Sequence, residues 1–130
     1  MRLLLDTHIL VWLATERDKL TVAELAAIAA AEALFLSAIS IWEIRLKWRN
    51  SLPKALATGL VTPEAALAFV DSSPIKLVSL DAHDCARPLE PQPPHGDPFD
   101  EMLLAQADRL GAKLLTRDKH LRDHPLAYRP

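Results

Sequence analysis

Five acidic residues stand where an α/β fold would bring carboxylates together at one edge of its sheet. The stretch LLLDTH begins with a short apolar run that closes on Asp6, and a similar run near the C-terminus closes on Asp118. Glu43 lies about a turn and a half into the helix predicted after a third apolar run, and Asp97 and Asp100 stand at the start of a later helix. In open α/β sheets ligands bind outside the carboxyl ends of the strands, so these acids are candidates for one site.

Each of these acids also has a structural interpretation. Asp6 can cap the following helix by accepting its unpaired amide protons. Asp97 and Asp100 can do the same at their own helix start, where negative charge interacts well with the helix dipole. Glu43 can form an exposed i,i+4 pair with Lys47, which stabilises a helix by only a few tenths of a kcal/mol. What separates the two interpretations is whether the acids converge.

Converging carboxylates favour divalent-metal chemistry. Crowded acids repel and raise one another's pKa values unless a cation neutralises them. Oxygen ligands alone indicate magnesium or manganese, and one or two such ions can activate water against a phosphodiester. The pattern therefore predicts a nuclease. Zinc is not favoured: His120 and His124 have i,i+4 spacing, but Pro125 follows them directly, no third ligand is evident, and both are predicted to be surface residues.

The elements that position these acids alternate between strand and helix. Strands are predicted at residues 3–5, 34–37, 75–80 and 112–118, and helices at 8–14, 22–29, 38–50, 63–70 and 98–110, with a proline-rich loop at 87–98. This alternation predicts an α/β fold with a parallel sheet and helices on both faces. Because parallel strands end at one edge, Asp6, Asp81 and Asp118 are expected to be neighbours.

The whole chain has the length and composition of one domain, residues 1–130. Half of its residues are hydrophobic, enough for a single core, and Cys85 is its only cysteine, so no intrachain disulfide can form. No signal peptide precedes the first strand and no stretch is apolar enough to span a bilayer, so a cytoplasmic location is expected.

The charge balance limits how the protein meets a polyanion. Lys and Arg number 15 against 17 Asp and Glu, a formal charge of −2, so the domain as a whole carries no nucleic-acid-binding signature. Any phosphate backbone must be held by a local patch, and the candidates for that role are Arg45, Lys47 and Arg117. Solvated helix and loop faces remain the alternative interpretation of these cations.

Four motifs, in order and with family-like spacing, resemble the PIN domain, and specifically the VapC-type toxins of bacterial toxin–antitoxin pairs. They are LLLDTHILVWL, LSAISIWEIRLK, HGDPFDEMLLAQA and LLTRD. The resemblance implies a PIN-like α/β/α sandwich with a central parallel sheet and a ribonuclease site that depends on Mg²⁺ or Mn²⁺. It covers nearly the whole chain.

The resemblance also assigns site residues. The family's first acid falls on Asp6, its helix glutamate on Glu43, its fourth acid on Asp118, and its third on either Asp97 or Asp100. Thr116 matches the hydroxyl residue before the last acid that can order a metal-bound water. Glu101 departs from the pattern, because relatives often carry arginine at this position.

The family further implies a homodimer, an RNA substrate and a small antitoxin protein that blocks the site, often through a basic side chain. A rival hypothesis is a non-catalytic module of the same fold whose acidic pocket only receives a basic partner peptide. A second rival is a phosphoryl-transfer domain with Asp6 as nucleophile. It lacks support because His8 stands where a D-x-D pattern needs a second acid.

Overall fold

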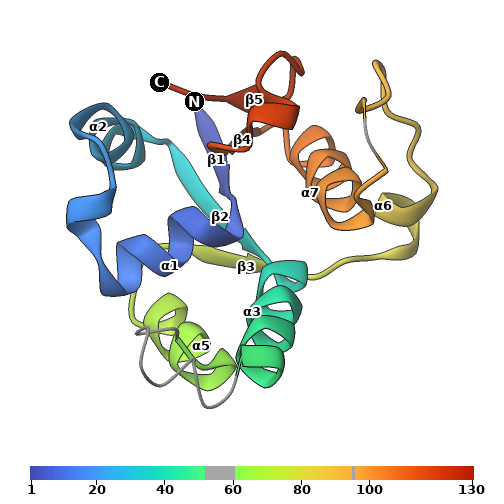
Figure 1. Ribbon diagram of the computed structural model, residues 1–130. Coiled ribbons are helices and arrows are strands. Elements are labelled where there is room, and N and C mark those ends of the chain that lie inside the picture. The colour runs from blue at the N-terminus through green and yellow to red at the C-terminus, as the bar shows by residue number, and fades with distance from the viewer. Residues whose placement is uncertain (52–60, 95) are drawn as a thin grey trace.

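The computed structural model describes residues 1–51, 61–94 and 96–130 (Figure 1). Its strands are β1 (Arg2–Leu5), β2 (Ala33–Ser37), β3 (Lys76–Val78), β4 (Lys113–Leu115) and β5 (Ala127–Tyr128). Its α-helices are α1 (Thr7–Thr15), α2 (Val22–Ala30), α3 (Ala38–Ser51), α5 (Pro63–Asp71), α6 (Ala82–Ala86) and α7 (Pro98–Arg109). Two short 3₁₀ turns are η1 (Arg17–Lys19) and η2 (Lys119–Leu121).

The sheet is parallel throughout, with the strand order β3-β2-β1-β4-β5. The first strand of the chain is therefore the central one: Leu4 pairs with Phe35 of β2 on one side and with Leu114 of β4 on the other. Strand order reverses beside β1, and a crevice at such a reversal is the usual ligand site of open α/β sheets.

Two hydrophobic cores lie on opposite faces of this sheet. One contains Leu3 and Leu5 and is covered by α1, α2 and α5, whereas the other contains Leu4 and Leu114 and is covered by α7 (Figure 1). Alternating side chains of β1 therefore serve both layers, as the pleat of a strand requires. The predicted α/β/α sandwich with a central parallel sheet is confirmed.

Local capping explains where the helices begin. Thr21 and Glu24 form the predicted capping box of α2, with Glu24 N donating to Thr21 Oγ1 at 3.0 Å and Thr21 N donating to Glu24 Oε1 at 2.8 Å. Thr62 caps α5 and Asp97 caps α7, each followed by a proline at the first helical position. Gly111, with a φ of 61°, lies just beyond the end of α7.

The third predicted strand is shorter than expected, and Asp81 is not part of the acidic site. β3 ends at Val78 because it pairs only with β2, at the sheet edge. Asp81 then caps α6, where its carboxylate accepts from Asp84 N at 2.9 Å. Its predicted proximity to Asp6 and Asp118 is therefore wrong: β2 lies between β3 and β1, and Asp81 does not line the cleft that contains Asp6 and Asp118.

Other departures concern short elements and one histidine. α6 and β5 are not predicted from the sequence, and the fourth strand ends at Leu115, before the expected limit of 118. His124 is buried, not a surface residue: its Nε2 lies 2.7 Å from Pro91 O, and its Nδ1 accepts from Leu126 N at 3.1 Å. No helix in the described part of the chain is long and apolar enough to cross a bilayer.

Candidate active site

Asp6 acts both as a helix cap and as a member of the acidic site. It follows β1 directly, is only 9% exposed, and its Oδ1 accepts from Thr7 N at 2.7 Å as the cap of α1. Its second oxygen, Oδ2, accepts a 2.6 Å hydrogen bond from Thr116 Oγ1. The structural and functional interpretations of this residue are therefore compatible.

Thr116 links the ends of β1 and β4. Its buried hydroxyl donates to Asp6 and at the same time accepts from Asp118 N at 3.0 Å. Asp118 in turn caps η2, with Oδ1 accepting from His120 N at 2.9 Å. One hydroxyl thus fixes the relative position of two acids that lie more than a hundred residues apart in the sequence.

Glu43 reaches the same region from α3. The Thr7 hydroxyl donates to Glu43 Oε1 at 2.8 Å and lies 2.9 Å from Ser40 Oγ. Burial raises the pKa of Glu43, the neighbouring Asp6 adds to that rise, and the Thr7 hydrogen bond opposes it. The alternative of an exposed pair with Lys47 is not observed, since the Lys47 ammonium lies 3.2 Å from His8 Nε2.

The two candidates for the third acid differ in their surroundings. Asp97 is exposed and its Oδ1 accepts from Phe99 N at 2.9 Å and Asp100 N at 3.4 Å, as the cap of α7. Asp100 is partly buried, and burial together with the nearby charges of Asp97, Asp118 and Asp6 raises its pKa to about 7. Asp100 therefore feels the electrostatic crowding of the acidic cluster most strongly.

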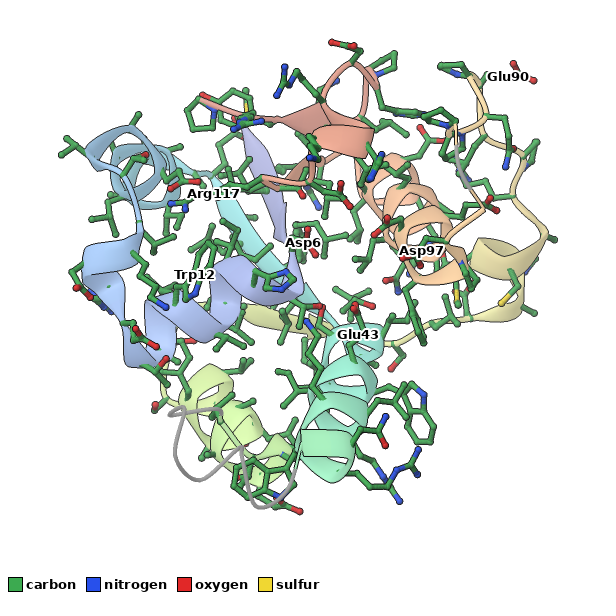
Figure 2. All side chains as sticks on the ribbon, viewed as in Figure 1. Asp6, Trp12, Glu43, Glu90, Asp97 and Arg117 are labelled. Atoms are coloured by element: carbon green, nitrogen blue, oxygen red, sulfur yellow. The ribbon has the colours of Figure 1, made fainter. Side chains whose placement is uncertain are left out.

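One cleft, of about 530 Å³, collects these side chains at the carboxyl edge of the sheet. We call it the acidic cleft; it is lined by Asp6, His8, Trp12, Glu43, Lys47, Asp97, Asp100, Arg117 and Asp118. Figure 2 shows Asp6, Glu43 and Asp97 around this region, reaching it from β1, α3 and the start of α7. All five acids predicted from the sequence thus meet in one place.

The donor set of the acidic cleft suits a hard divalent cation. Carboxylate oxygens are the ligands that magnesium and manganese prefer, and the pKa values of Asp100 and Glu43 are raised, first by burial and then by the neighbouring carboxylates. Among the described residues, no group of three His, Cys, Asp or Glu side chains is already arranged to hold a metal ion. The chemistry of the ligands fits such an ion, and side-chain rotation would have to complete the geometry.

The three cations predicted to hold substrate have different surroundings. Arg117 is paired with the buried Glu24, with its Nε donating to Glu24 Oε2 at 2.7 Å, and it lies 4.6 Å from the Trp12 ring. Arg45 does not line the acidic cleft and instead lies over Trp42, 5.2 Å from its ring. Lys47 lines the cleft directly.

Other site residues were not identified from the sequence. Thr7 holds Glu43 and is itself in contact with Ser40, and the only signals for these two residues were their positions, one residue after Asp6 and one helical turn before Glu43. Glu101, the departure from the family pattern, does not line the acidic cleft, because its Oε1 accepts from Gln92 Nε2 at 3.0 Å on the outer side of α7. It therefore adds no charge to the cluster.

Comparison with known proteins agrees with this site. The family model described as PIN domain matches residues 3–125. Ribonuclease VapC22 of Mycobacterium tuberculosis is 28% identical over 138 residues, which cover 93% of this chain and 90% of that protein. The resemblance to VapC-type proteins is thereby confirmed.

Solved structures show the same fold at low identity. VapBC2 from Rickettsia felis, bound to a DNA fragment from its promoter, matches with a TM-score of 0.66 and 17% identity over 98% of this chain and 96% of that chain. DNA-bound VapBC from Salmonella typhimurium matches with a TM-score of 0.63 and 18% identity over 98% and 95% of the two chains. On the strength of a family match that spans nearly its whole length, this chain belongs to the PIN domain family.

Proposed function

We propose that this protein is a metal-dependent endoribonuclease that hydrolyses RNA phosphodiester bonds and acts as the toxin of a toxin–antitoxin pair. The observation that carries the proposal is the acidic cleft, in which carboxylates from four separate segments of the chain converge. The full-length similarity to a protein named as a ribonuclease supports the same reaction class.

We assign the metal ligands to Asp6, Glu43, Asp100 and Asp118, with Mg²⁺ or Mn²⁺ as the ion. Asp100 is preferred to Asp97 as the third acid, because Asp100 is partly buried beside the charges of Asp118 and Asp6 whereas the side chain of Asp97 is exposed. When bound, such an ion lowers the pKa of water and stabilises charge on a phosphodiester oxygen.

The chain's own residues orient the attacking water and neutralise charge on the phosphate. Glu43 is held through Oε1 by Thr7, which leaves Oε2 to face the ion or to take a proton from an attacking water. Lys47 supplies positive charge at the cleft wall for a non-bridging phosphate oxygen. Arg117 pairs with Glu24 and keeps the neighbouring Asp118 in place. Substrate binding by Arg117 and by Arg45 stays a prediction.

Partners follow from the charge of the cleft. A small antitoxin protein that inserts an arginine would neutralise the carboxylates with a planar fork that matches their geometry. The similar solved structures are named as VapBC complexes, which supports an antitoxin partner. We also propose a homodimer, on the basis of the same resemblance to VapC-type proteins.

The test is cleavage of a pool of tRNA and structured RNA by the purified protein with Mg²⁺, with Mn²⁺ and with chelator. Asp6→Asn is the inactive variant, and Asp123→Asn, an exposed acid outside the acidic cleft, is the matched control. Cutting that requires both metal and Asp6 and that survives in the control supports the proposal. Metal binding without cutting of any RNA would instead support the non-catalytic binding module.

A further inference from the structure

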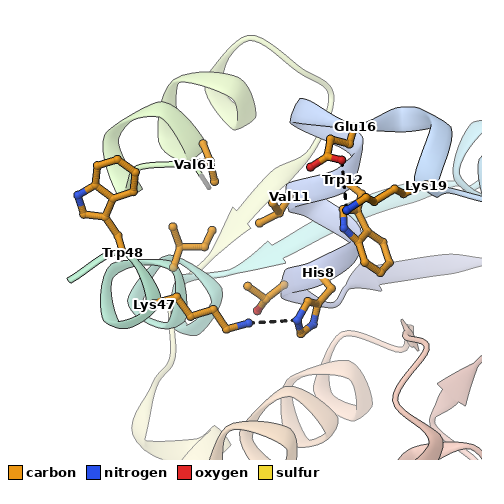
Figure 3. A pocket seen from close by; sticks show the side chains of 10 residues that line it. His8, Val11, Trp12, Glu16, Lys19, Lys47, Trp48 and Val61 are labelled. Atoms are coloured by element: carbon orange, nitrogen blue, oxygen red, sulfur yellow. Dashed lines mark hydrogen bonds and ion pairs between the residues drawn. The ribbon is translucent and has the colours of Figure 1, made fainter. Parts of the chain in front are cut away.

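A second cavity, of about 350 Å³, adjoins the acidic cleft between α1 and α3 (Figure 3). We call it the tryptophan pocket; its apolar walls are Val11, Trp12, Ile44 and Trp48, and its cations are Lys19 and Lys47. Three residues, His8, Trp12 and Lys47, line both this pocket and the acidic cleft. The two cavities are therefore adjacent and share these three side chains as a common wall.

The Trp12 indole is held firmly at this junction. Arg117 covers it at 4.6 Å, and the His8 ring lies 5.9 Å from it at an interplanar angle of 44°. Lys19 pairs with Glu16 at 3.2 Å beside the ring, as the dashed line in Figure 3 shows. A fixed aromatic surface with ammonium groups next to it is the combination on which proteins stack bases and hold the attached phosphates.

The size and position of the pocket fit one such group. Its volume lies at the lower end of the range, roughly 300–1,000 Å³, that small-molecule sites occupy. Because Lys47 lines both cavities, a strand that runs from the carboxylates toward the pocket passes Lys47, and the nucleotide next to the bound phosphodiester then lies at the mouth of the pocket.

We propose that the tryptophan pocket binds one unpaired nucleobase of the RNA strand whose phosphodiester lies in the acidic cleft, with the base against Trp12. This proposal rests on the proposed function, because it takes RNA as the substrate. Stacking tolerates every base, so the pocket fixes where along the strand cleavage occurs and does not by itself choose the base. Paired bases are excluded, since their faces are covered within a helix.

The experiment measures binding without cleavage. Fluorescein-labelled single-stranded penta-ribonucleotides are titrated with the Asp100→Asn protein in Mg²⁺, and binding is followed by fluorescence anisotropy. One oligonucleotide is intact, and five others each lack a single base at one position. We expect base removal at one position to weaken binding by roughly 5- to 100-fold, the range that base–aromatic stacking gives.

Variants of three tryptophans then test whether the effect of base removal on binding comes from the tryptophan pocket. Added to the same background, Trp12→Leu should weaken binding of the intact strand by the same factor and abolish the difference between the intact and the base-free strand. Trp48→Leu, at the far wall, tests the same pocket if Trp12→Leu does not fold. Trp42→Leu, an exposed tryptophan of α3 that lines neither cavity, is the matched control and should keep the full difference.

Two results would overturn the proposal. If no single base matters for binding, the pocket does not hold a nucleobase and a protein segment becomes its better occupant. If Trp12→Leu weakens intact and base-free strands equally, the indole only shapes the cleft. Because this assay needs no turnover, a base effect in the Asp100→Asn protein, together with a native protein that fails to cut RNA in the cleavage assay, would refute the nuclease proposal alone.

Discussion

Replacing Asp100 with asparagine should stabilise the metal-free protein at pH 8 while removing a proposed metal ligand. The carboxyl group of Asp100 is partly buried and faces Asp97, Asp118 and Asp6, so its pKa is raised to about 7. In the unfolded chain the same group ionises near pH 4, roughly three units lower. Folding at pH 8 therefore places a charge where the structure disfavours it.

The size of the effect follows from that shift. Each unit corresponds to about 1.4 kcal/mol, so three units give about 4 kcal/mol, and solvent screening of this partly exposed group reduces the figure to about 2 kcal/mol. Asparagine also forfeits the favourable interaction of a negative charge with the first turn of α7, at most about 1 kcal/mol. The net gain is about 1–2 kcal/mol, or roughly 3–8 °C in Tm for a domain of this length.

The sign of the stability change caused by Asp100→Asn can be checked by varying the pH. Between about pH 4 and 7 Asp100 holds fewer protons in the unfolded chain than in the folded one, so its contribution to the stability of the native protein falls as pH rises through this window. The advantage of Asp100→Asn should thus be near zero at pH 4.5 and largest at pH 8. Urea unfolding in chelator at both pH values measures it, with Asp123→Asn as the control that should show no such trend. A variant that is less stable than the native protein at pH 8, or whose advantage does not change with pH, would refute this account of the cluster.

Three further outcomes are expected. Thr116→Val removes the 2.6 Å hydrogen bond to Asp6 and should lower kcat roughly 10- to 100-fold in an RNA cleavage assay, whereas Thr116→Ser should restore it. Arg117→Leu removes the ion-pair partner of the buried Glu24 carboxylate, which keeps only its capping hydrogen bond from Thr21 N, and should lower the unfolding free energy by about 3 kcal/mol in urea, with Glu24→Leu in the same chain recovering part of the loss. Because Arg117 lowers the pKa of Glu24, this loss should persist at neutral pH and shrink only as acid protonates Glu24 in the native fold, below about pH 4.5. Leu4→Ala, at a position with no exposed surface in the middle of the sheet, should cost about 2–5 kcal/mol by thermal or urea unfolding, and a smaller loss would mean that the two cores relax around the cavity.

Strong local signals account for what could be predicted from the sequence. The apolar runs that close on Asp6 and Asp118 and the caps at Thr21, Thr62 and Asp97 act over a few residues, so each could be found without the fold. The convergence of the acids needed one more step, the rule that parallel strands end at a common edge.

Residues that act through distant partners could not be predicted. Asp81 carries the same strand-end signal as Asp6, but only the strand order shows that it lies at the edge of the sheet. Arg117 resembled a phosphate contact because its partner Glu24 lies 93 residues away. His124 was expected at the surface for the same reason, since Pro91, which its ring contacts, comes from a loop with no periodic pattern.

The central position of β1 has a consequence for synthesis of the protein. The first strand of this domain to leave the ribosome needs β4, the fourth, as its neighbour, and the Thr116–Asp6 hydrogen bond spans 110 residues. Contacts of such high sequence separation form late and slow the folding of a domain. A nascent chain that has emerged only through α7 carries Asp6, Glu43 and Asp100 but lacks Thr116 and Asp118, so it cannot assemble the acidic cleft. Any activity of that cleft therefore begins only when nearly the whole domain has been synthesised and folded.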